Sequence, residues 1–204
     1  MSAIVLGQGD ALLIVDLQVD FLPGGSLGVP HGDQVIAPIN RLIALYQAQA
    51  LPVYASRDWH PESHCSFAAQ DGPWPPHCVA GTAGAAFSAD MHLPDDVIVV
   101  SKADTPGADA YSAFSGTGLA AAMRERGIRR LAVCGLATDY CVLNTVLDGL
   151  ADFEILIVAD AMRAVDVHPG DGDHAMTRML GAGAAPVRLS EHRLVADVEL
   201  GARL

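Results

Sequence analysis

Three residues of reactive types, an acid, an amine and a thiol, each come at or just after the end of an apolar segment. Asp16 closes the first such segment, Lys102 follows the third, and Cys141 lies six residues beyond the fourth. Because ligands of open parallel sheets bind beyond the carboxyl ends of the strands, we expect these side chains to meet at one edge of a sheet. A thiol beside a carboxylate base and an ammonium group is a candidate nucleophile.

The segment Gly135–Cys141 leads from an apolar run into a helical pattern, with Thr138 as a candidate N-cap. Cys141 then lies in the first helical turn, where the helix dipole and a nearby lysine can lower a thiol pKa from ~8.5 to ~3.5–7.5. The alternative is that Cys141 packs as a small apolar side chain, which is the commoner fate of a free cysteine.

Asp16 and Lys102 also have two interpretations each. A carboxylate at the end of an apolar strand is either a general base or half of a structural ion pair. Lys102 is the single lysine among twelve basic residues. A compact ammonium suits a thiolate better than a guanidinium does, and the alternative is that Lys102 is a solvated loop residue.

A second group of candidate ligands lies in the long connection from Arg57 to Asp96. Imidazole and carboxylate ligands suit Zn²⁺, Fe²⁺ or Mn²⁺, and a site built from them would keep positions open for a ligand. The histidines could instead stabilise loop turns, or Cys65 and Cys78 could complete a closed structural zinc site. The residues concerned are Asp58, His60, His64 and His77.

Short apolar runs alternate with helical patterns along the chain, which favours βα units around a parallel sheet. The runs are almost wholly apolar, as expected for strands covered on both faces. The predicted strands are Ala11–Leu17, Pro52–Ser56, Val97–Ser101, Leu131–Gly135, Ile155–Asp160 and Ala185–Leu189. The predicted helices are Asp33–Gln49, Gly118–Arg126, Asp139–Ala151 and Gly170–Leu180.

Composition narrows the classes of function. The 204 residues, 51% hydrophobic and 18% charged, suit one folded domain over 1–204 and argue against disorder. A net charge of −12 disfavours nucleic acid and anionic membranes as partners and leaves a small molecule. The first residues lack the pattern of a secretory signal and no apolar run is long enough to span a bilayer, so we expect a cytoplasmic protein with reduced cysteines.

Five motifs in order resemble those of the nicotinamidases, within the isochorismatase-like cysteine hydrolase superfamily. The similarity covers nearly the whole chain. The motifs are Ile14–Leu27, Arg57–Pro61, Trp74–Val79, Lys102 and Gly135–Cys141. The resemblance implies a three-layer α/β/α fold with a six-stranded parallel sheet, isochorismatase-like and Rossmann-like.

The resemblance also implies roles for particular residues. Asp16, Lys102 and Cys141 would be the catalytic triad, and the backbone N–H groups of Ala137 and Cys141 would form the oxyanion hole, beside a cis peptide between Leu136 and Ala137. One divalent metal, zinc first with iron or manganese as alternatives, would be held by Asp58, His60 and His77. Some members of the family also use a histidine at the position of His64 as a metal ligand. The substrate ring would lie among Phe21, Trp74 and Tyr111.

The implied reaction is hydrolysis of nicotinamide to nicotinate and ammonia through a thioester on Cys141, with the metal orienting the pyridine ring. The sequence does not decide between NAD salvage and nicotinate catabolism, and members of the family are often homo-oligomers. The nearest alternative is another amidase of the superfamily, acting on maleamate, N-carbamoyl amines or ureidoacrylate. Isochorismatase itself, a non-catalytic zinc-stabilised domain and a metallohydrolase with a metal-bound water as nucleophile are further alternatives.

Overall fold

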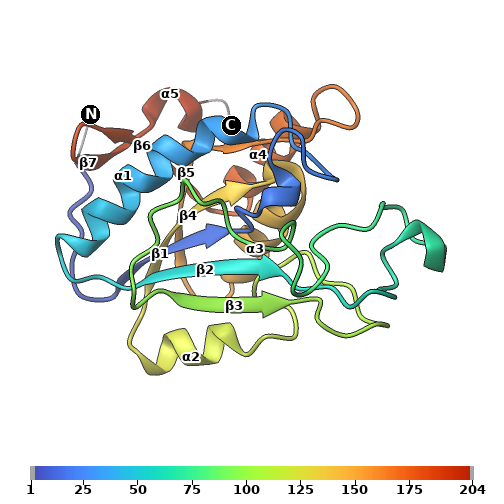
Figure 1. Ribbon diagram of the computed structural model, residues 1–204. Helices are drawn as coiled ribbons and strands as arrows, with labels where there is room; N and C mark the ends of the chain where they lie inside the picture. The colour runs from blue at the N-terminus through green and yellow to red at the C-terminus, as the bar shows by residue number, and fades with distance from the viewer. Residues whose placement is uncertain (1–2, 203–204) are drawn as a thin grey trace.

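A computed structural model describes residues 3–202 and has one seven-stranded sheet in the order β3-β2-β1-β4-β5-β6-β7 (Figure 1). The first six strands are parallel, and β7 is antiparallel to β6. The strands are β1 (Asp10–Val15), β2 (Val53–Asp58), β3 (Ile98–Lys102), β4 (Arg130–Leu136), β5 (Glu154–Arg163), β6 (Ala185–Ser190) and β7 (Arg193–Ala196).

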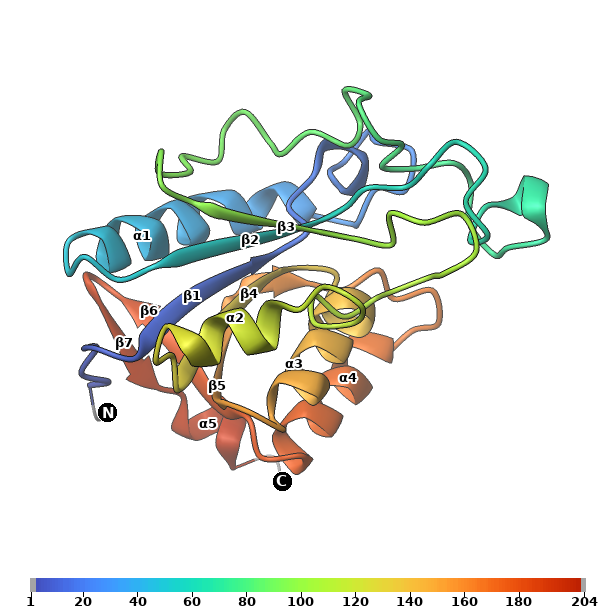
Figure 2. The ribbon, with the colours of Figure 1, turned by 90° about the horizontal axis from the view of Figure 1, so that it is seen from below.

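Helices cover both faces of the sheet (Figure 2). Helix α1 lies on one face, and α2, α3 and α4 lie on the other. Alternate residues of β1 contribute to the two separate cores, with Leu12 and Ile14 in one and Leu13 and Val15 in the other. Every residue of β1 is buried, which explains the uninterrupted apolar run from Ala11 to Val15. The helices are α1 (Ile36–Gln47), α2 (Leu119–Glu125), α3 (Leu143–Gly149), α4 (Asp171–Gly181) and α5 (Val198–Gly201).

The three-layer α/β/α prediction is confirmed, but the prediction of six strands is wrong by one. The missed strand, β7, has only four residues and follows β6 after a turn in which Glu191 has a φ of 52°. So short a strand gives little alternation of apolar and polar residues, and the helical crossovers that identify parallel strands are not needed for an antiparallel hairpin. Helix α5, also four residues long, was likewise not predicted.

The strand order places a topological switch point next to β1. The chain leaves β1 to form β2 and β3 on one side, and later returns to place β4 on the other. Ligands of such sheets bind where the order reverses, beyond the carboxyl ends of the strands. Residues 59–97 and 103–118 connect β2 to β3 and β3 to α2, and both long connections extend past those strand ends (Figure 1).

Gly135 allows β4 to approach β1 closely at this edge. It pairs with Val15 and has a φ of +118°, and a Cβ atom built on it would lie 2.1 Å from the Val15 carbonyl oxygen. We expect Gly135→Ala to destabilise the fold by about 3 kcal/mol or more, because it combines an unfavourable backbone conformation with a backbone clash. Chemical denaturation measures this change. Gly181→Ala at the end of α4 is the control, since its Cβ meets nothing within 4 Å, and equal destabilisation of the two variants would contradict the explanation.

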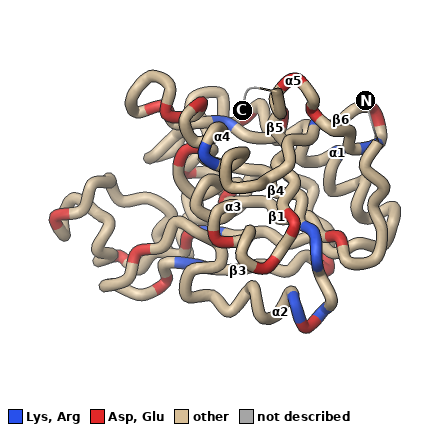
Figure 3. The backbone as a smooth tube through the Cα atoms, turned by 180° about the vertical axis from the view of Figure 1, so that it is seen from behind, with Lys and Arg blue, Asp and Glu red and all other residues tan. Residues whose placement is uncertain are grey.

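The distribution of charge and the hydropathy of the helices can be compared with the predictions about nucleic-acid and membrane partners. Red acidic segments occur on loops and helices around the trace in Figure 3, and blue basic segments are fewer. Among the described residues, the structure has no helix that is both long and apolar enough to span a membrane. The absence of a nucleic-acid partner stays a prediction.

Candidate active site

Asp16 begins the site at the carboxyl end of β1. It follows the last strand residue with a φ of 47°, a left-handed conformation that turns the chain sharply out of the sheet. Its side chain is fully buried, and the Ser56 hydroxyl donates a hydrogen bond of 2.7 Å to Oδ1. This leaves Oδ2 directed at another partner.

Lys102, the last residue of β3, is that partner. Its Nζ atom lies 3.0 Å from Asp16 Oδ2, 2.5 Å from Asp58 Oδ1 and 3.5 Å from Cys141 Sγ. The side chain is completely buried, so a long aliphatic stem brings one ammonium between two carboxylates and a thiol. The predicted meeting of acid, amine and thiol is therefore what the structure has, and the solvated-loop interpretation of Lys102 is wrong.

Cys141 lies on a π-helical turn, Thr138–Val142, that continues into α3. The N-cap prediction for Thr138 is wrong: Ala137 is the capping residue, and no side chain caps this turn. The wider π turn differs from the regular helix start on which the prediction rested. The peptide bond between Leu136 and Ala137 is cis, as the family resemblance implies.

Burial is the largest influence on the pKa values of Cys141, Asp16 and Lys102. Burial raises the pKa of the Cys141 thiol well above its ordinary value despite the opposing effect of Lys102, so the prediction of a lowered pKa is wrong. Burial also raises the pKa of Asp16, an effect that Lys102 opposes. For Lys102, burial acts to lower the pKa, but Asp16 and Asp58 outweigh it and keep the ammonium charged. A carboxylate with a raised pKa is a stronger base, which suits removal of a thiol proton.

Asp58, His60 and His77 form a second cluster beside the first. One candidate ligand atom from each lies within 4.8 Å of the others, and all three side chains are buried. His60 Nδ1 lies 3.1 Å from the Ala103 carbonyl oxygen and His77 Nδ1 lies 2.8 Å from the Pro75 carbonyl oxygen. These acceptors favour the tautomers in which Nδ1 carries the proton and Nε2 presents a lone pair, the arrangement typical of metal-binding histidines.

The charges of this cluster also suit a cation. Burial acts to raise the pKa of Asp58, but Lys102 and His60 together lower it, so the group is a carboxylate at neutral pH. Burial lowers the pKa of His77, which favours the neutral imidazole. One carboxylate and two neutral imidazoles suit a divalent metal, and three protein ligands leave positions open.

His64 lies next to this cluster but is directed elsewhere. Its ring stacks on that of His60 with centroids 4.2 Å apart. Its Nδ1 lies 2.7 Å from Ser66 Oγ and its Nε2 lies 3.2 Å from the Ala108 carbonyl oxygen, so both ring nitrogens have partners. Among residues 3–202, the groups of atoms that could share an ion include neither His64 nor the cysteines Cys65 and Cys78.

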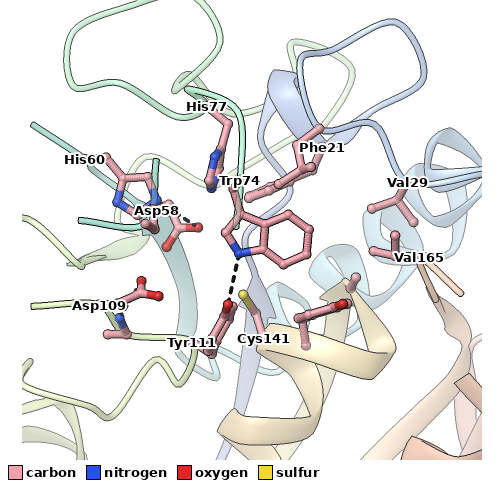
Figure 4. A pocket seen from close by; sticks show the side chains of 15 residues that line it. Phe21, Val29, Asp58, His60, Trp74, His77, Asp109, Tyr111, Cys141 and Val165 are labelled. Carbon is pink, nitrogen blue, oxygen red and sulfur yellow. Dashed lines mark hydrogen bonds and ion pairs between the residues drawn. The ribbon is translucent and has the colours of Figure 1, made fainter. Parts of the chain in front are cut away.

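A pocket joins the two clusters (Figure 4). The three side chains expected around the substrate ring, Phe21, Trp74 and Tyr111, all line it, together with Cys141 and the three candidate metal ligands. Trp74 Nε1 donates a hydrogen bond of 3.0 Å to the Tyr111 hydroxyl, so residues from the two long connections meet over the pocket. The oxyanion roles of the Ala137 and Cys141 N–H groups stay predictions.

Sequence reasoning missed other residues of the pocket wall. Tyr140 packs edge-on against Trp74 with ring centroids 5.2 Å apart, and its place before the nucleophile was a usable signal. Val165, which follows β5, also lines the pocket, and its backbone N–H donates a hydrogen bond of 2.9 Å to Asp139 Oδ1. Nothing in the local pattern of Val29, Val165 or Asp109 indicates that they line a pocket.

Comparisons with known proteins agree with this architecture. The model of the isochorismatase domain matches residues 10–191. The nicotinamidase of Escherichia coli (strain K12) is 40% identical over 203 residues, covering 89% of this chain and 95% of that protein. The pyrazinamidase of Pyrococcus horikoshii, solved in complex with zinc, superposes with a TM-score of 0.85 at 43% identity, over 89% of this chain and 99% of that one.

A third similar structure is PnC1 from L. infantum in complex with nicotinate, with a TM-score of 0.85 and 37% identity over 92% of this chain and 96% of the other. The family model spans most of the chain, and the sequence identity extends over nearly all of both proteins. The fold, the cysteine at the start of a helix after β4 and the sequence similarity all agree, and the chain belongs to the isochorismatase domain family.

Proposed function

We propose that this chain is a nicotinamidase, a single-domain amidohydrolase that converts nicotinamide to nicotinate and ammonia. The observation that carries the proposal is the position of Lys102 Nζ, which joins Asp16 and Asp58 and lies 3.5 Å from Cys141 Sγ. This one contact links a thiol nucleophile and its base to a ligand of the adjacent metal cluster. The pyrazinamidase and nicotinamidase relatives support the choice of a heteroaromatic carboxamide.

The first half of the reaction forms a thioester. Asp16 removes the proton of the Cys141 thiol as Sγ attacks the carboxamide carbon, and Lys102 stabilises the developing negative charge. The N–H groups of Ala137 and Cys141 hold the carbonyl oxygen as it becomes negative, a contribution worth ~10²–10³ in rate per donor. Asp16 then gives the proton to the departing nitrogen, the C–N bond breaks and ammonia leaves.

The second half releases the acid. Water enters the place of ammonia, Asp16 takes one of its protons, and the hydroxyl oxygen attacks the thioester carbon. The C–S bond breaks, the proton held by Asp16 returns to Sγ, and nicotinic acid is formed, which becomes nicotinate by giving its proton to ammonia or water in solution. Cys141 and Asp16 recover their starting protonation states.

Asp58, His60 and His77 would hold one divalent ion, with zinc preferred and iron or manganese as alternatives. When bound there, the ion supplies a Lewis acid that a ring nitrogen can ligate, and so acts as an orienting template. Phe21, Trp74 and Tyr111 provide flat apolar surfaces for the ring. Asp16, Lys102 and Cys141 carry out the cleavage of the C–N bond.

Ammonia release from nicotinamide by the purified, zinc-loaded protein tests the proposal, with maleamate, an N-carbamoyl amine and ureidoacrylate in parallel. Turnover of nicotinamide with far higher kcat/KM than the other amides is expected. Preference for one of the others would make the chain a different amidase of the same family. No turnover of any amide, with ligand binding retained, would indicate a binding domain.

Removal of the metal should affect substrate binding more than bond cleavage. Because the three ligands lie beside the triad and are not part of it, we expect chelation to raise KM for nicotinamide by about 10-fold or more, as for loss of a binding contribution of about 1.4 kcal/mol or more, with a smaller change in kcat. Steady-state kinetics before and after chelation, with zinc added back, measure both constants. Loss of kcat with KM unchanged would contradict a purely orienting role.

A further inference from the structure

Gln18 is a buried amide that the proposed reaction does not use. It lies two residues after Asp16, where the chain leaves β1, and its exposed fraction is 0%. A buried amide must find partners for two N–H donors and one carbonyl acceptor. The structure supplies all three.

Two of the partners belong to one residue, the candidate metal ligand Asp58. Gln18 Nε2 donates to the Asp58 carbonyl oxygen at 2.8 Å, and the Asp58 N–H donates to Gln18 Oε1 at 2.8 Å. The third bond runs from Nε2 to the Ala85 carbonyl oxygen at 2.9 Å. Gln18 thus holds both backbone polar groups of Asp58 and ties them to the connection between β2 and β3.

The sheet does not provide these bonds itself. Pairing between β1 and β2 ends with Ile14 opposite Ala55, followed by a single bond from the Asp16 N–H to the Ser56 carbonyl oxygen. Asp16 then turns out of the sheet, while β2 continues to Asp58. On this side the Gln18 side chain takes the place of the missing strand.

The orientation of Asp58 matters to both clusters. Its Oδ1 atom contacts Lys102, and its Oδ2 atom lies 3.6 Å from His60 Nε2. A small rotation of the Asp58 backbone would move one oxygen away from Lys102 or the other away from the metal cluster. The bonds to Gln18 oppose that rotation.

We propose that Gln18 is a positioning residue that fixes Asp58 for metal binding, and thereby sets the affinity of the metal site. The inference rests on the metal site of the proposed function, but not on its substrate. Partners that orient metal ligands typically contribute 10–100-fold in affinity. Gln18→Met removes the amide at nearly constant length and should weaken zinc binding by about that factor.

Zinc affinity is measured on the purified protein by competition with a chromophoric chelator, with no substrate present. Gln18→Asn is the second variant, because it keeps a polar side chain that is one methylene too short to reach Asp58, and the same direction of change is expected. Thermal unfolding of the metal-free proteins reports any general loss of stability.

Asn40→Leu is the matched control. Asn40 of α1 also holds a loop through its amide, donating to the Asp90 carbonyl oxygen and accepting from the His92 N–H, each at 2.8 Å. It should lower stability and leave zinc affinity unchanged. If the role of Gln18 were purely structural, Gln18→Met would likewise lower stability and leave zinc affinity unchanged.

The outcomes separate clearly. Zinc affinity of Gln18→Met within about twofold of wild type, equal weakening in Asn40→Leu, or wild-type protein that binds no zinc would each overturn the inference. Zinc binding that depends on Gln18 in a protein that does not hydrolyse nicotinamide would support the inference and reject the proposed function. Nicotinamide turnover by a protein that binds no zinc would support the proposed function and overturn the inference about Gln18.

Discussion

Replacement of Cys141 by alanine should abolish measurable ammonia release from nicotinamide, with a fall in kcat of about 10⁴-fold or more. The reason is that the proposed reaction passes through a covalent thioester, and Cys141 is the one cysteine among residues 3–202 that lines the pocket. Cys134 and Cys78 are buried, and burial raises the pKa of each thiol. Loss of a nucleophile that acts as a unit with its base removes the contribution of the whole set.

The measurement is single-turnover and steady-state ammonia release, with binding of nicotinamide followed separately. Ligand binding should survive in Cys141→Ala, since the aromatic and metal-ligand walls of the pocket are intact. Cys134→Ala is the control, because Cys134 lies within β4, does not line the pocket, and has its Sγ atom hydrogen-bonded to the Leu13 carbonyl oxygen at 3.9 Å. It should keep near-normal turnover.

Substantial turnover in Cys141→Ala would support the metallohydrolase alternative, in which a water molecule is the nucleophile. Mass spectrometry provides an independent check on the wild-type protein. Rapid quenching with nicotinamide should reveal an acyl adduct on Cys141, and its absence under conditions of slow deacylation would count against the thioester.

The reactive residues of this site can be predicted from the sequence more readily than the contacts that hold them in place. Asp16, Lys102 and Cys141 could be predicted to meet because each is near the end of a strand, and parallel strand ends lie at one edge of a sheet. The single lysine in an arginine-rich chain drew attention to Lys102. Asp58 and His60 were found by residue type and spacing.

Other features depend on tertiary structure that a local pattern does not encode. The raised pKa of Cys141 follows from burial of its thiol, which depends on the folded structure and not on the position of the residue at the start of a helix. The His64 ring nitrogens are bonded to Ser66 and to Ala108. The contact with Ala108 depends on the path of the loop after β3. Gln18 and Asp139 act through backbone groups of residues 40 and 26 positions away, so neighbouring sequence contains no signal for them.

Replacement of Lys102 by methionine should have the largest effect on stability as well as eliminating turnover. Methionine fills a similar volume but leaves Asp16 and Asp58 buried without their shared cation. Removing one partner of a buried ion pair typically costs about 3–5 kcal/mol, because an uncompensated charge remains. Urea denaturation of the metal-free protein at neutral pH measures the change in the free energy of unfolding.

The double variant Asp16→Asn/Lys102→Met is the matched control. It removes one of the stranded charges together with the lysine, so it should be more stable than Lys102→Met alone and equally inactive. A single variant that loses less than about 1 kcal/mol, or a double variant that is less stable than the single one, would show that the ammonium is not what compensates the two carboxylates.

The destabilisation caused by Lys102→Met should become smaller as the pH is lowered. In the wild type, Lys102 lowers the pKa of Asp58, so the stability this group contributes is present above its unfolded value of 3.8 and is lost as the pH falls through the folded value. Without Lys102, burial raises the pKa of both carboxyls, so the folded state takes up protons as the pH falls from 7 and is stabilised by them. The difference in unfolding free energy between wild type and Lys102→Met should therefore narrow as the pH is lowered toward the ordinary carboxyl value. A difference that stays constant or widens would indicate that lost packing, and not stranded charge, explains the destabilisation.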